Sequence, residues 1–204
     1  RNRLMFPIRD SAGRVVAFTG RALAADDVAK YLNSPETELY HKSEILFGMD
    51  FAKDAIRVRK FTMLVEGQID VILAHQAGFQ NAVALSGTAL TEKHLSLMKR
   101  YSENLMLVLD ADTAGLKATA RSAELALRSG LRVKAARLPK GKDPAELIGE
   151  DPKDFAQRIA AAKPIVEFFL AELAEKESSS HRLLRSAENI VLPLIAAMPS
   201  PMER

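Results

Sequence analysis

The chain has 204 residues, of which 48% are hydrophobic and 27% charged, with a formal net charge of +3 and no cysteine. This composition allows one large folded domain with or without an appendage, fits a reducing cytoplasm, and excludes a thiolate zinc site. No run approaches the roughly 20 apolar residues that a membrane-spanning helix needs, so no membrane contact is expected.

The positive charge is unevenly placed. Residues 1–60 hold 11 Lys/Arg against 8 Asp/Glu, whereas residues 61–204 hold 18 of each kind. An excess of cations before an acidic centre suits a polyanionic partner. The sequence opens on Arg1 and stops soon after Ser200-Pro201, a helix-start signal, so we expect it to be a piece of a longer protein.

The first sixty residues are predicted to be rich in β-structure. Two β-rich runs, 4–9 and 14–20, are joined by the hairpin signal Asp10-Ser11-Ala12-Gly13. Residues 31–37 are predicted to form a loop, and a helix is predicted near 49–58.

From residue 61 onward, short apolar strands alternate with helices. The predicted strands are 61–66, 81–86, 105–110 and 132–138, and the predicted helices are 69–77, 91–102 and 114–129. This order indicates an α/β fold with a mostly parallel sheet flanked by helices on both faces. In such sheets the functional site lies beyond the carboxyl ends of the strands.

After Asp143-Pro144 the pattern is purely helical. Ile165, Phe169 and Leu173 recur every four residues and form an apolar helix stripe. Ser178-Ser179-Ser180 is expected to end that helix and to cap another one running to about Ala197. We therefore divide the chain into a basic β-rich segment (1–60), a central domain (61–145) and a truncated helical subdomain (146–204).

Two predicted strands stop on carboxylates. Glu66 follows one strand, with Asp70 four residues later across a glycine turn, and Asp110 and Asp112 follow another. Carboxylates gathered at one edge repel each other unless divalent cations neutralise them, so a magnesium site for phosphate chemistry is expected. A carboxylate such as Glu66 is costly at the end of a buried strand without a partner.

Structural interpretations compete with this one. Asp70 could simply favour the helix dipole, and Asp110 with Asp112 could form an Asx turn and helix cap. Haloacid-dehalogenase phosphatases also carry Asp-x-Asp, but they need Thr or Val two residues after the second Asp, where this chain has Ala114. The combination with Glu66 one strand over favours the metal site.

The pair of motifs, Glu-Gly-x-x-Asp followed by Asp-x-Asp about forty residues later, resembles the Toprim domain. That module occurs in topoisomerases, nucleases, recombination mediators and DnaG-type primases. The preceding segment resembles the bacterial primases among them. Its matching stretches are Met5–Asp10, Gly13–Val16, Gly20-Arg21, Lys30–Thr37, His41–Ser43, Leu46–Gly48 and Ser86–Thr88.

The primase resemblance departs at one position. The third acidic motif of the family commonly reads Asp-Pro-Asp, whereas this chain has Asp143-Pro144-Ala145-Glu146. Either the second carboxylate is dispensable or Glu146 replaces it. Glu66, Asp110 and Asp112 are therefore the first candidates for metal ligands, and Asp70 and Asp143 are expected to orient ligands or metal-bound water.

The resemblance implies an enzyme of DNA replication in the bacterial cytoplasm. It would synthesise a short RNA primer on a single-stranded DNA template from ribonucleoside triphosphates, using Mg²⁺ or, in its place, Mn²⁺. A replicative helicase partner and a zinc module are expected from the family but in regions outside this chain. Arg21, Lys30, Asn33 and Lys42 map to the nucleotide- and template-contacting basic segment.

Two rivals remain. The chain could belong to a DNA-cutting Toprim enzyme, a topoisomerase or nuclease, or it could be a silent Toprim module that only binds nucleic acid. Among the histidines, His75, His94 and His181 are interpreted as surface or partly buried structural residues, and His41 lies in the motif loop.

Overall fold

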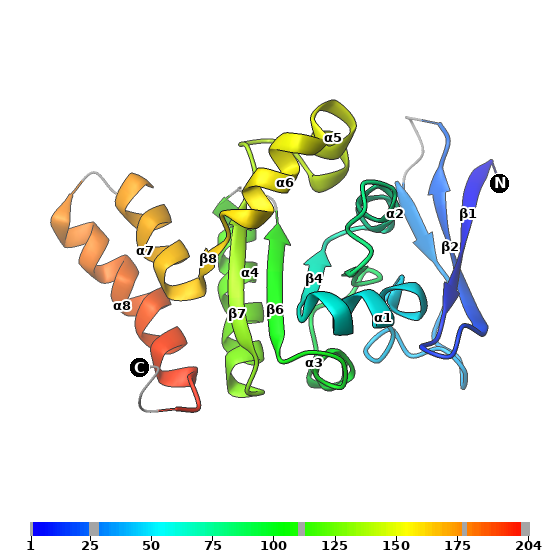
Figure 1. The fold of residues 1–204 in the computed structure, drawn as a ribbon, viewed down its shortest axis with the longest axis horizontal. Coiled ribbons are helices and arrows are strands. Elements are labelled where there is room, and N and C mark those ends of the chain that lie inside the picture. The colour runs from blue at the N-terminus through cyan, green and yellow to red at the C-terminus, as the bar shows by residue number, and fades with distance from the viewer. Residues whose placement is uncertain (1, 25–28, 110–112, 177–178, 201–204) are drawn as a thin grey trace.

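The computed structural model describes residues 2–24, 29–109, 113–176 and 179–200. It contains a three-stranded sheet near the N-terminus and a five-stranded sheet covered by helices on both faces (Figure 1). The α/β class and the mostly parallel central sheet predicted from sequence are confirmed. No helix in these ranges is long and apolar enough to cross a membrane.

The small sheet is antiparallel in the order β1-β2-β3. Strands β1 (Arg3–Arg9) and β2 (Val15–Ala22) form the predicted hairpin, and Gly13 in its turn adopts a φ of +88°. The loop predicted over 31–37 is wrong in its first three residues, because β3 (Tyr31–Asn33) pairs with the open edge of β2. Such a short strand has no periodicity of its own and forms because a partner is available.

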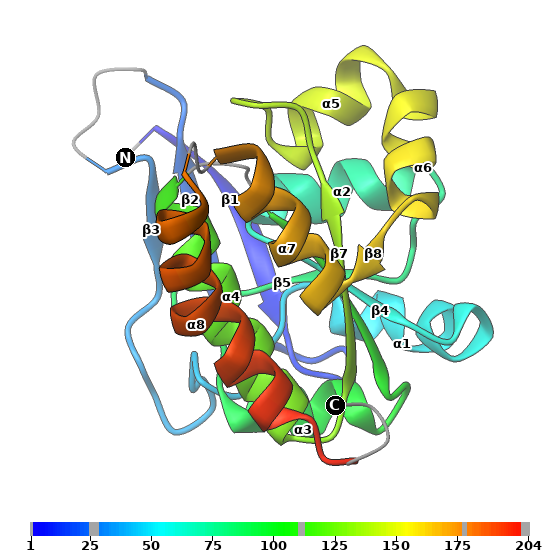
Figure 2. The same ribbon diagram turned by 90° about the vertical axis from the view of Figure 1, so that its left-hand side faces the viewer.

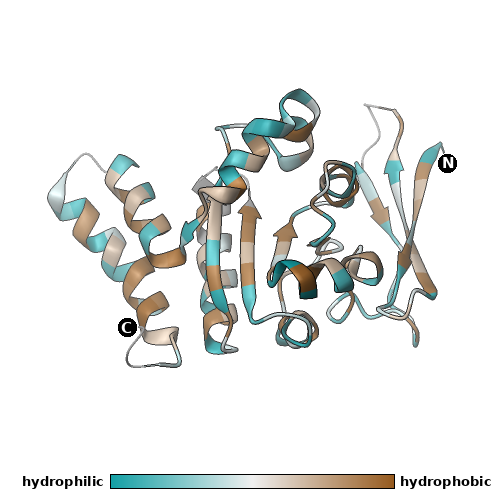
Figure 3. Cartoon of the chain, in the orientation of Figure 1, coloured by the Kyte–Doolittle hydropathy of each residue, from teal (hydrophilic) through white to brown (hydrophobic). Residues whose placement is uncertain are grey.

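The large sheet has the order β5-β4-β6-β7-β8. Its strands are β4 (Thr62–Val65), β5 (Ala82–Ala84), β6 (Asn104–Leu109), β7 (Arg132–Arg137) and β8 (Lys163–Pro164). Strands β5, β4, β6 and β7 run parallel to one another, and β8 is antiparallel to β7. Strands β4 and β6 are almost wholly hydrophobic, as Figure 3 shows in brown, which is the composition of strands buried on both faces.

Helices pack on both faces of this sheet. One layer contains α1 (Met49–Arg59), α3 (Glu92–Lys99), α4 (Thr113–Arg128), α7 (Ile165–Lys176) and α8 (Ser180–Ala197). The other contains α2 (Gln68–Gln76), α5 (Pro144–Glu150) and α6 (Pro152–Ala160). The alternation along β6 serves both: Leu105 and Leu107 join the first core, and Met106 and Val108 join the second.

The C-terminal part is not purely helical. Strand β8 adds two residues to the edge of β7 before α7 begins. Two residues, one of them a proline, are too short a pattern to predict a strand from sequence. The predicted stripe of α7 is buried at Ile165, Phe169 and Leu173, and Ser179 caps α8. Helix α8 packs against α4 and α7, as Figure 2 shows from the side of the molecule.

Candidate metal and nucleotide site at the carboxyl edge of the sheet

The carboxyl ends of β4 and β6 lie side by side. The two strands are parallel neighbours, with Leu64 opposite Leu107, so the residues that follow them leave from the same edge. Glu66 directly follows β4. The predicted ligands Asp110 and Asp112 follow β6 but lie outside the described residues. Glu66 itself is exposed, and β4 ends at Val65, one residue before the predicted end of this strand.

Asp70 is the buried carboxylate of this edge, with only 6% of its surface exposed. It lies in the first turn of α2 and both of its oxygens accept backbone hydrogen bonds. Oδ2 accepts from the Gly67 N–H at 2.8 Å and Oδ1 from the Ala145 N–H at 3.1 Å. The first bond confirms the helix-start interpretation of Asp70. The second connects α2 to α5 across 75 positions of sequence.

The protonation of Asp70 is shifted by its surroundings. Burial raises the pKa of Asp70 to about 6, and the charges of Asp143 and Glu66 act in the same direction. The hydrogen bonds from Gly67 and Ala145 oppose this rise because they favour the ionised form. The negative charges of Asp143 and Glu66 therefore disfavour the ionised form of Asp70 at this edge.

Asp143 caps α5. Its Oδ1 accepts from the Glu146 N–H at 2.7 Å, and the Glu146 carboxylate turns back to the Asp143 N–H at 3.4 Å. This reciprocal pair is a capping box. Glu146 thus has a local partner at the helix start, and it is the backbone N–H of Ala145 that contacts the acidic edge.

A cavity of about 850 Å³ opens beside Glu66. It is bounded by the segment that follows β5, including Gly87 and Thr88, and by residues of α4 such as Arg121 and Leu125. Cavities of roughly 300–1,000 Å³ are typical of small-molecule and cofactor sites. The cavity therefore has room for a nucleotide next to the acidic edge.

Asn33 holds the small sheet against the rim of this cavity. Its Nδ2 donates to the Ser86 carbonyl at 3.1 Å. A Cβ atom at Gly87, whose φ is +71°, would lie 2.7 Å from the same Nδ2. A side chain at Gly87 would strain the backbone and displace the Asn33 amide group, which contacts protein backbone in this structure.

Tyr31 is a residue of this region that sequence reasoning missed. Burial raises the pKa of Tyr31, Arg21 lowers it, and the charges of Asp70 and Asp143 raise it further. The Arg21 guanidinium lies 6.0 Å from the Tyr31 ring centre, across the β2–β3 pair. The small sheet thus places Tyr31 in the field of the acidic edge, with Arg21 next to it. The sequence around Tyr31 does not predict its closeness to Asp70 and Asp143, because this depends on how the two sheets pack.

The remaining cationic candidates lie on the small sheet and the loop after it. Lys30 is exposed directly before β3, and its carbonyl accepts from the Ala22 N–H at 2.9 Å. Lys42 is half-buried on the loop beside the start of α3. The ammonium groups of both form no ion pair within residues 2–24, 29–109, 113–176 and 179–200.

His41, His75 and His94 contact a backbone carbonyl or a nearby carboxylate. Nε2 of His75 and of His94 each faces a carbonyl at 2.9 Å, and Nδ1 of His41 faces Glu36 at 3.2 Å. His94 is completely buried, more than the sequence led us to expect, and His181 is exposed. Within the described part of the chain, no group of three or more His, Cys, Asp or Glu side chains could hold a metal ion.

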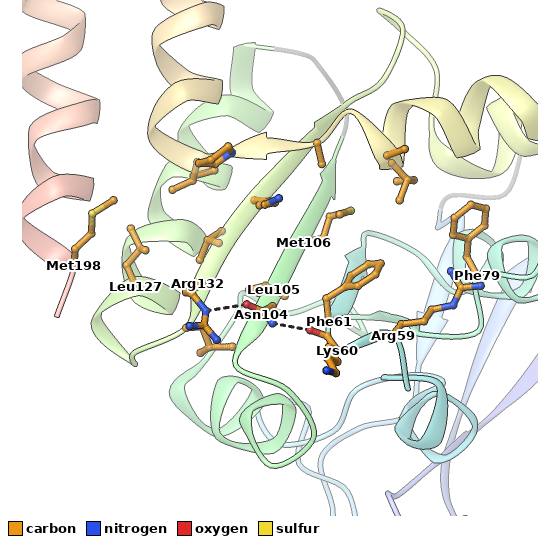
Figure 4. Close-up of a pocket in the computed structure, with 18 of the residues that line it drawn as sticks. Arg59, Lys60, Phe61, Phe79, Asn104, Leu105, Met106, Leu127, Arg132 and Met198 are labelled. Carbon is orange, nitrogen blue, oxygen red and sulfur yellow. Dashed lines mark hydrogen bonds between the residues drawn. The ribbon is translucent and has the colours of Figure 1, made fainter. Parts of the chain in front are cut away.

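A second large cavity lies far from this chemistry. Its volume is about 870 Å³, and it opens at the amino ends of β4, β6 and β7, where Phe61, Asn104 and Arg132 line it (Figure 4). Its lining is mostly apolar and includes Met106 and Leu127. It contains none of the predicted site residues, so size alone does not identify the functional cavity here.

The fold and the acidic edge define a Toprim-type domain, and residues 63–148 match the model of a Toprim-like family. Residues 1–53 match the model described as the N-terminal domain of the DNA primase catalytic core. Together with the relatives described next, these matches show that the chain belongs to the bacterial DnaG-type primases and corresponds to part of their catalytic core.

Relatives of known name agree with this assignment. A DNA primase of Myxococcus xanthus is 40% identical over 207 residues, which covers 100% of this chain and 34% of the relative. A crystal structure of a DNA primase domain from Pseudomonas aeruginosa matches with a TM-score of 0.84 at 38% identity, covering 99% of this chain and 64% of that one. A structure of the DnaG primase catalytic domain bound to ssDNA matches with a TM-score of 0.83 at 36% identity, covering 99% and 65%.

The chain therefore spans about a third of the length of the curated relatives that it matches.

Proposed function

We propose that this chain is the part of a DNA primase catalytic core that carries out metal-dependent synthesis of short RNA primers on single-stranded DNA. The observation that supports this most strongly is the parallel pairing of β4 with β6. Glu66 directly follows β4, and β6 ends at Leu109 at the same edge of the sheet, immediately before Asp110 in the sequence. The names of the relatives favour primer synthesis over the DNA-cutting and silent alternatives.

The groups at this edge fit a hard divalent cation. Carboxylate oxygens are the ligands that Mg²⁺ prefers, and it binds through one or two of them while keeping water and substrate phosphates. The nitrogen atoms Nε2 of His75 and His94 are turned to backbone carbonyls, so neither competes as a ligand. Glu66, Asp110 and Asp112 would hold the ion, and Mn²⁺ could replace Mg²⁺. When bound, such an ion lowers the pKa of the attacking hydroxyl and neutralises developing phosphoryl charge.

Asp70 and Asp143 would support this site indirectly, by fixing the helix starts next to it. Asp70 spends both oxygens on backbone N–H groups and thereby fixes the start of α2 and of α5. Asp143 caps α5 at the same edge. Their role would be to place the edge and to hold metal-bound water rather than to react.

The reaction would join a 3′-hydroxyl to the α-phosphate of an incoming ribonucleoside triphosphate, with pyrophosphate as the leaving group. The hydroxyl proton would pass to solvent, and the new P–O bond would replace the bond to pyrophosphate. Arg21, Lys30 and Lys42 would neutralise triphosphate or DNA backbone charge, and Asn33 would hold the rim of the cavity or contact a sugar or base. Catalysis of this kind depends on positioning and electrostatics, so few other groups are needed.

The division into 1–60, 61–145 and 146–204 remains our proposal for the organisation of the chain. In this division the first segment supplies cations and the second supplies the acidic edge. The third adds β8 to the sheet and packs α8 against α4 and α7. A replicative helicase would bind through a region outside this chain, and a zinc module would also lie outside it.

A titration with nucleotides tests the proposed site. Binding of ATP and dATP would be measured with and without Mg²⁺ or Mn²⁺ for the chain and for Asp110→Ala/Asp112→Ala. We expect metal-dependent triphosphate binding that the double variant loses. A matched control is Asp54→Asn, an exposed carboxylate on α1. Absence of triphosphate binding by the folded chain would instead favour a DNA-cutting or silent Toprim domain.

A further inference from the structure

The buried imidazole of His94 is not used by the site described above, although it contacts one of its proposed residues. His94 has no exposed surface, and it lies in the first turn of α3. Its Nε2 lies 2.9 Å from the carbonyl oxygen of Lys42, which is 52 positions away in sequence. Its Nδ1 lies 3.3 Å from the backbone nitrogen of Thr91.

These two partners fix the proton on the ring. A carbonyl oxygen can only accept, so Nε2 carries the hydrogen; a backbone N–H can only donate, so Nδ1 is bare. Both nitrogens of a neutral imidazole are therefore satisfied. Burial lowers the pKa of His94 and outweighs the hydrogen bonds to the backbone of Lys42 and Ile45, which act in the opposite direction, so the neutral form is favoured.

The rest of the α3 start holds the same short segment. The Thr91 hydroxyl donates to the Ser43 carbonyl at 2.6 Å and accepts from the His94 N–H at 3.2 Å. Lys93 forms an ion pair with Glu44. Three successive residues, 42 to 44, are thus held by three side chains of one helix start.

The other side of Lys42 is held as well. Its own N–H donates to Oε1 of Glu36 at 2.9 Å, while its carbonyl accepts from His94. The backbone of Lys42 is therefore fixed at both its N–H and its carbonyl. Its ammonium group forms no hydrogen bond or ion pair within the described residues, so the freedom that remains lies in the side chain.

We propose that His94 is a positioning residue: through its Nε2–H bond to the Lys42 carbonyl it fixes the loop from which Lys42 reaches the triphosphate of an incoming nucleotide. This inference rests on the proposed function, in which Lys42 contacts that triphosphate. It assigns His94 and Thr91, at the start of α3, an indirect role in nucleotide binding, through the position of Lys42 and not through contact with the nucleotide.

The test compares two histidines that make the same kind of bond. His94→Leu removes the bond to Lys42. His75→Leu is the matched control, because Nε2 of His75 also faces a backbone carbonyl at 2.9 Å, that of Ala82, but not one in the Lys42 loop. His94→Gln retains an N–H donor in place of Nε2–H. For each full-length variant we would measure the ATP dissociation constant with Mg²⁺, the melting temperature, and hydrogen exchange of amides 42–45.

We expect His94→Leu to weaken ATP binding about tenfold, the effect of losing one hydrogen bond that orders a ligand-binding group. His94→Gln should stay within about threefold of the parent, and His75→Leu should lower the melting temperature without changing ATP affinity. Exchange of amides 42–45 should rise in His94→Leu only. In a Lys42→Ala background, His94→Leu should add nothing, because the two residues act through one interaction.

Several results would overturn the inference. The first is an unchanged ATP affinity in folded His94→Leu. The second is a loss of ATP affinity on adding His94→Leu to Lys42→Ala that equals the loss in the parent. The third is unchanged hydrogen exchange of amides 42–45 in His94→Leu. If His94→Leu does not fold, the second variant is Thr91→Val, which removes the hydroxyl hydrogen bond to the Ser43 carbonyl. It should also raise the hydrogen exchange of amides 42–45 and weaken ATP binding. If Lys42→Ala itself leaves ATP binding intact, the positioning role fails, whereas the proposed function fails only if Asp110 and Asp112 are also dispensable.

Discussion

At the scale of single residues, the carboxylates of the acidic edge differ in what they can do. Glu66 is exposed and follows β4, so it can meet a ligand. Asp70 is buried and gives both oxygens to backbone N–H groups of Gly67 and Ala145. Two carboxylates of one edge thus differ in role: Glu66 is available to a ligand, and Asp70 stabilises the fold.

The titration of Asp70 should be visible in stability. Its pKa of about 6 in the folded chain lies above the ordinary value of 3.8. The folded state therefore binds the proton more tightly than the unfolded chain. The resulting stabilisation is fully present below about pH 4 and is lost as the pH rises through about 6, with a size of about 3 kcal/mol.

The measurement is urea denaturation in metal-free buffer between pH 4 and 7 for the parent chain and Asp70→Asn. As the pH falls, the free energy of unfolding of the parent should increase relative to that of Asp70→Asn. Asp54→Asn, at an exposed position, serves as the control and should run parallel to the parent. A constant difference between parent and Asp70→Asn would contradict the raised pKa.

Gly87 offers a second prediction at this scale. Gly87→Ala and Gly141→Ala place a Cβ at similar backbone conformations, with φ of +71° and +77°. Only at Gly87 does the new atom meet another group, Nδ2 of Asn33, whereas nothing lies within 4 Å at Gly141. We expect Gly141→Ala to cost about 1 kcal/mol of unfolding free energy and Gly87→Ala about 2 kcal/mol. Equal costs in urea denaturation would show that Asn33 does not constrain this turn.

At the scale of elements, an ion pair joins α7 to β7. Glu172 on α7 is 3% exposed in its side chain and lies 3.0 Å from Arg137 on β7, which is 46% exposed. Glu175, one turn later and 57% exposed, pairs with the same Arg137. A buried charge depends on its partner much more than an exposed one does.

Arg137→Ala should therefore cost about 2 kcal/mol of unfolding free energy, because it leaves the buried Glu172 carboxylate with a more distant cation, Lys176 at 3.8 Å. Adding Glu172→Leu should restore part of that loss, since the unpaired charge is then removed. Glu175→Ala should change stability by less than about 0.5 kcal/mol. Chemical denaturation of the three variants checks this, and a double variant less stable than Arg137→Ala would refute it.

Much of the element order could be predicted because it has local causes. The apolar runs that became β4 and β6 and the stripe Ile165, Phe169 and Leu173 carry their own periodicity. Strands β3 and β8 could not be predicted, because each forms only where a neighbouring strand offers an open edge.

The same division applies to the site. The carboxylates Glu66 and Asp70 were found from motif spacing. The bond from Ala145 to Asp70, the burial of His94 against Lys42 and the position of Tyr31 all join residues dozens of positions apart. Such contacts depend on the packed fold, and no local pattern encodes them.

At the scale of the whole molecule, the two sheets have complementary roles. The small sheet brings Tyr31 into the field of Asp70 and Asp143, with Arg21 beside the Tyr31 ring. Asn33 connects the same sheet to the rim of the cavity beside Glu66. Cationic and acidic groups thus converge from two sheets, which suits a triphosphate held between cations and a metal-binding edge. The second cavity, at the amino ends of the strands, lies outside this arrangement.

The most direct test of this account is ribonucleotide incorporation on a single-stranded DNA template by the full-length protein with Mg²⁺. The parent and the control Asp54→Asn should make short RNA, and Glu66→Gln and Asp110→Asn should each reduce the rate at least about 100-fold while remaining folded. Primer synthesis that persists in both variants would contradict the assignment of the carboxyl edge of β4 and β6 as the catalytic centre.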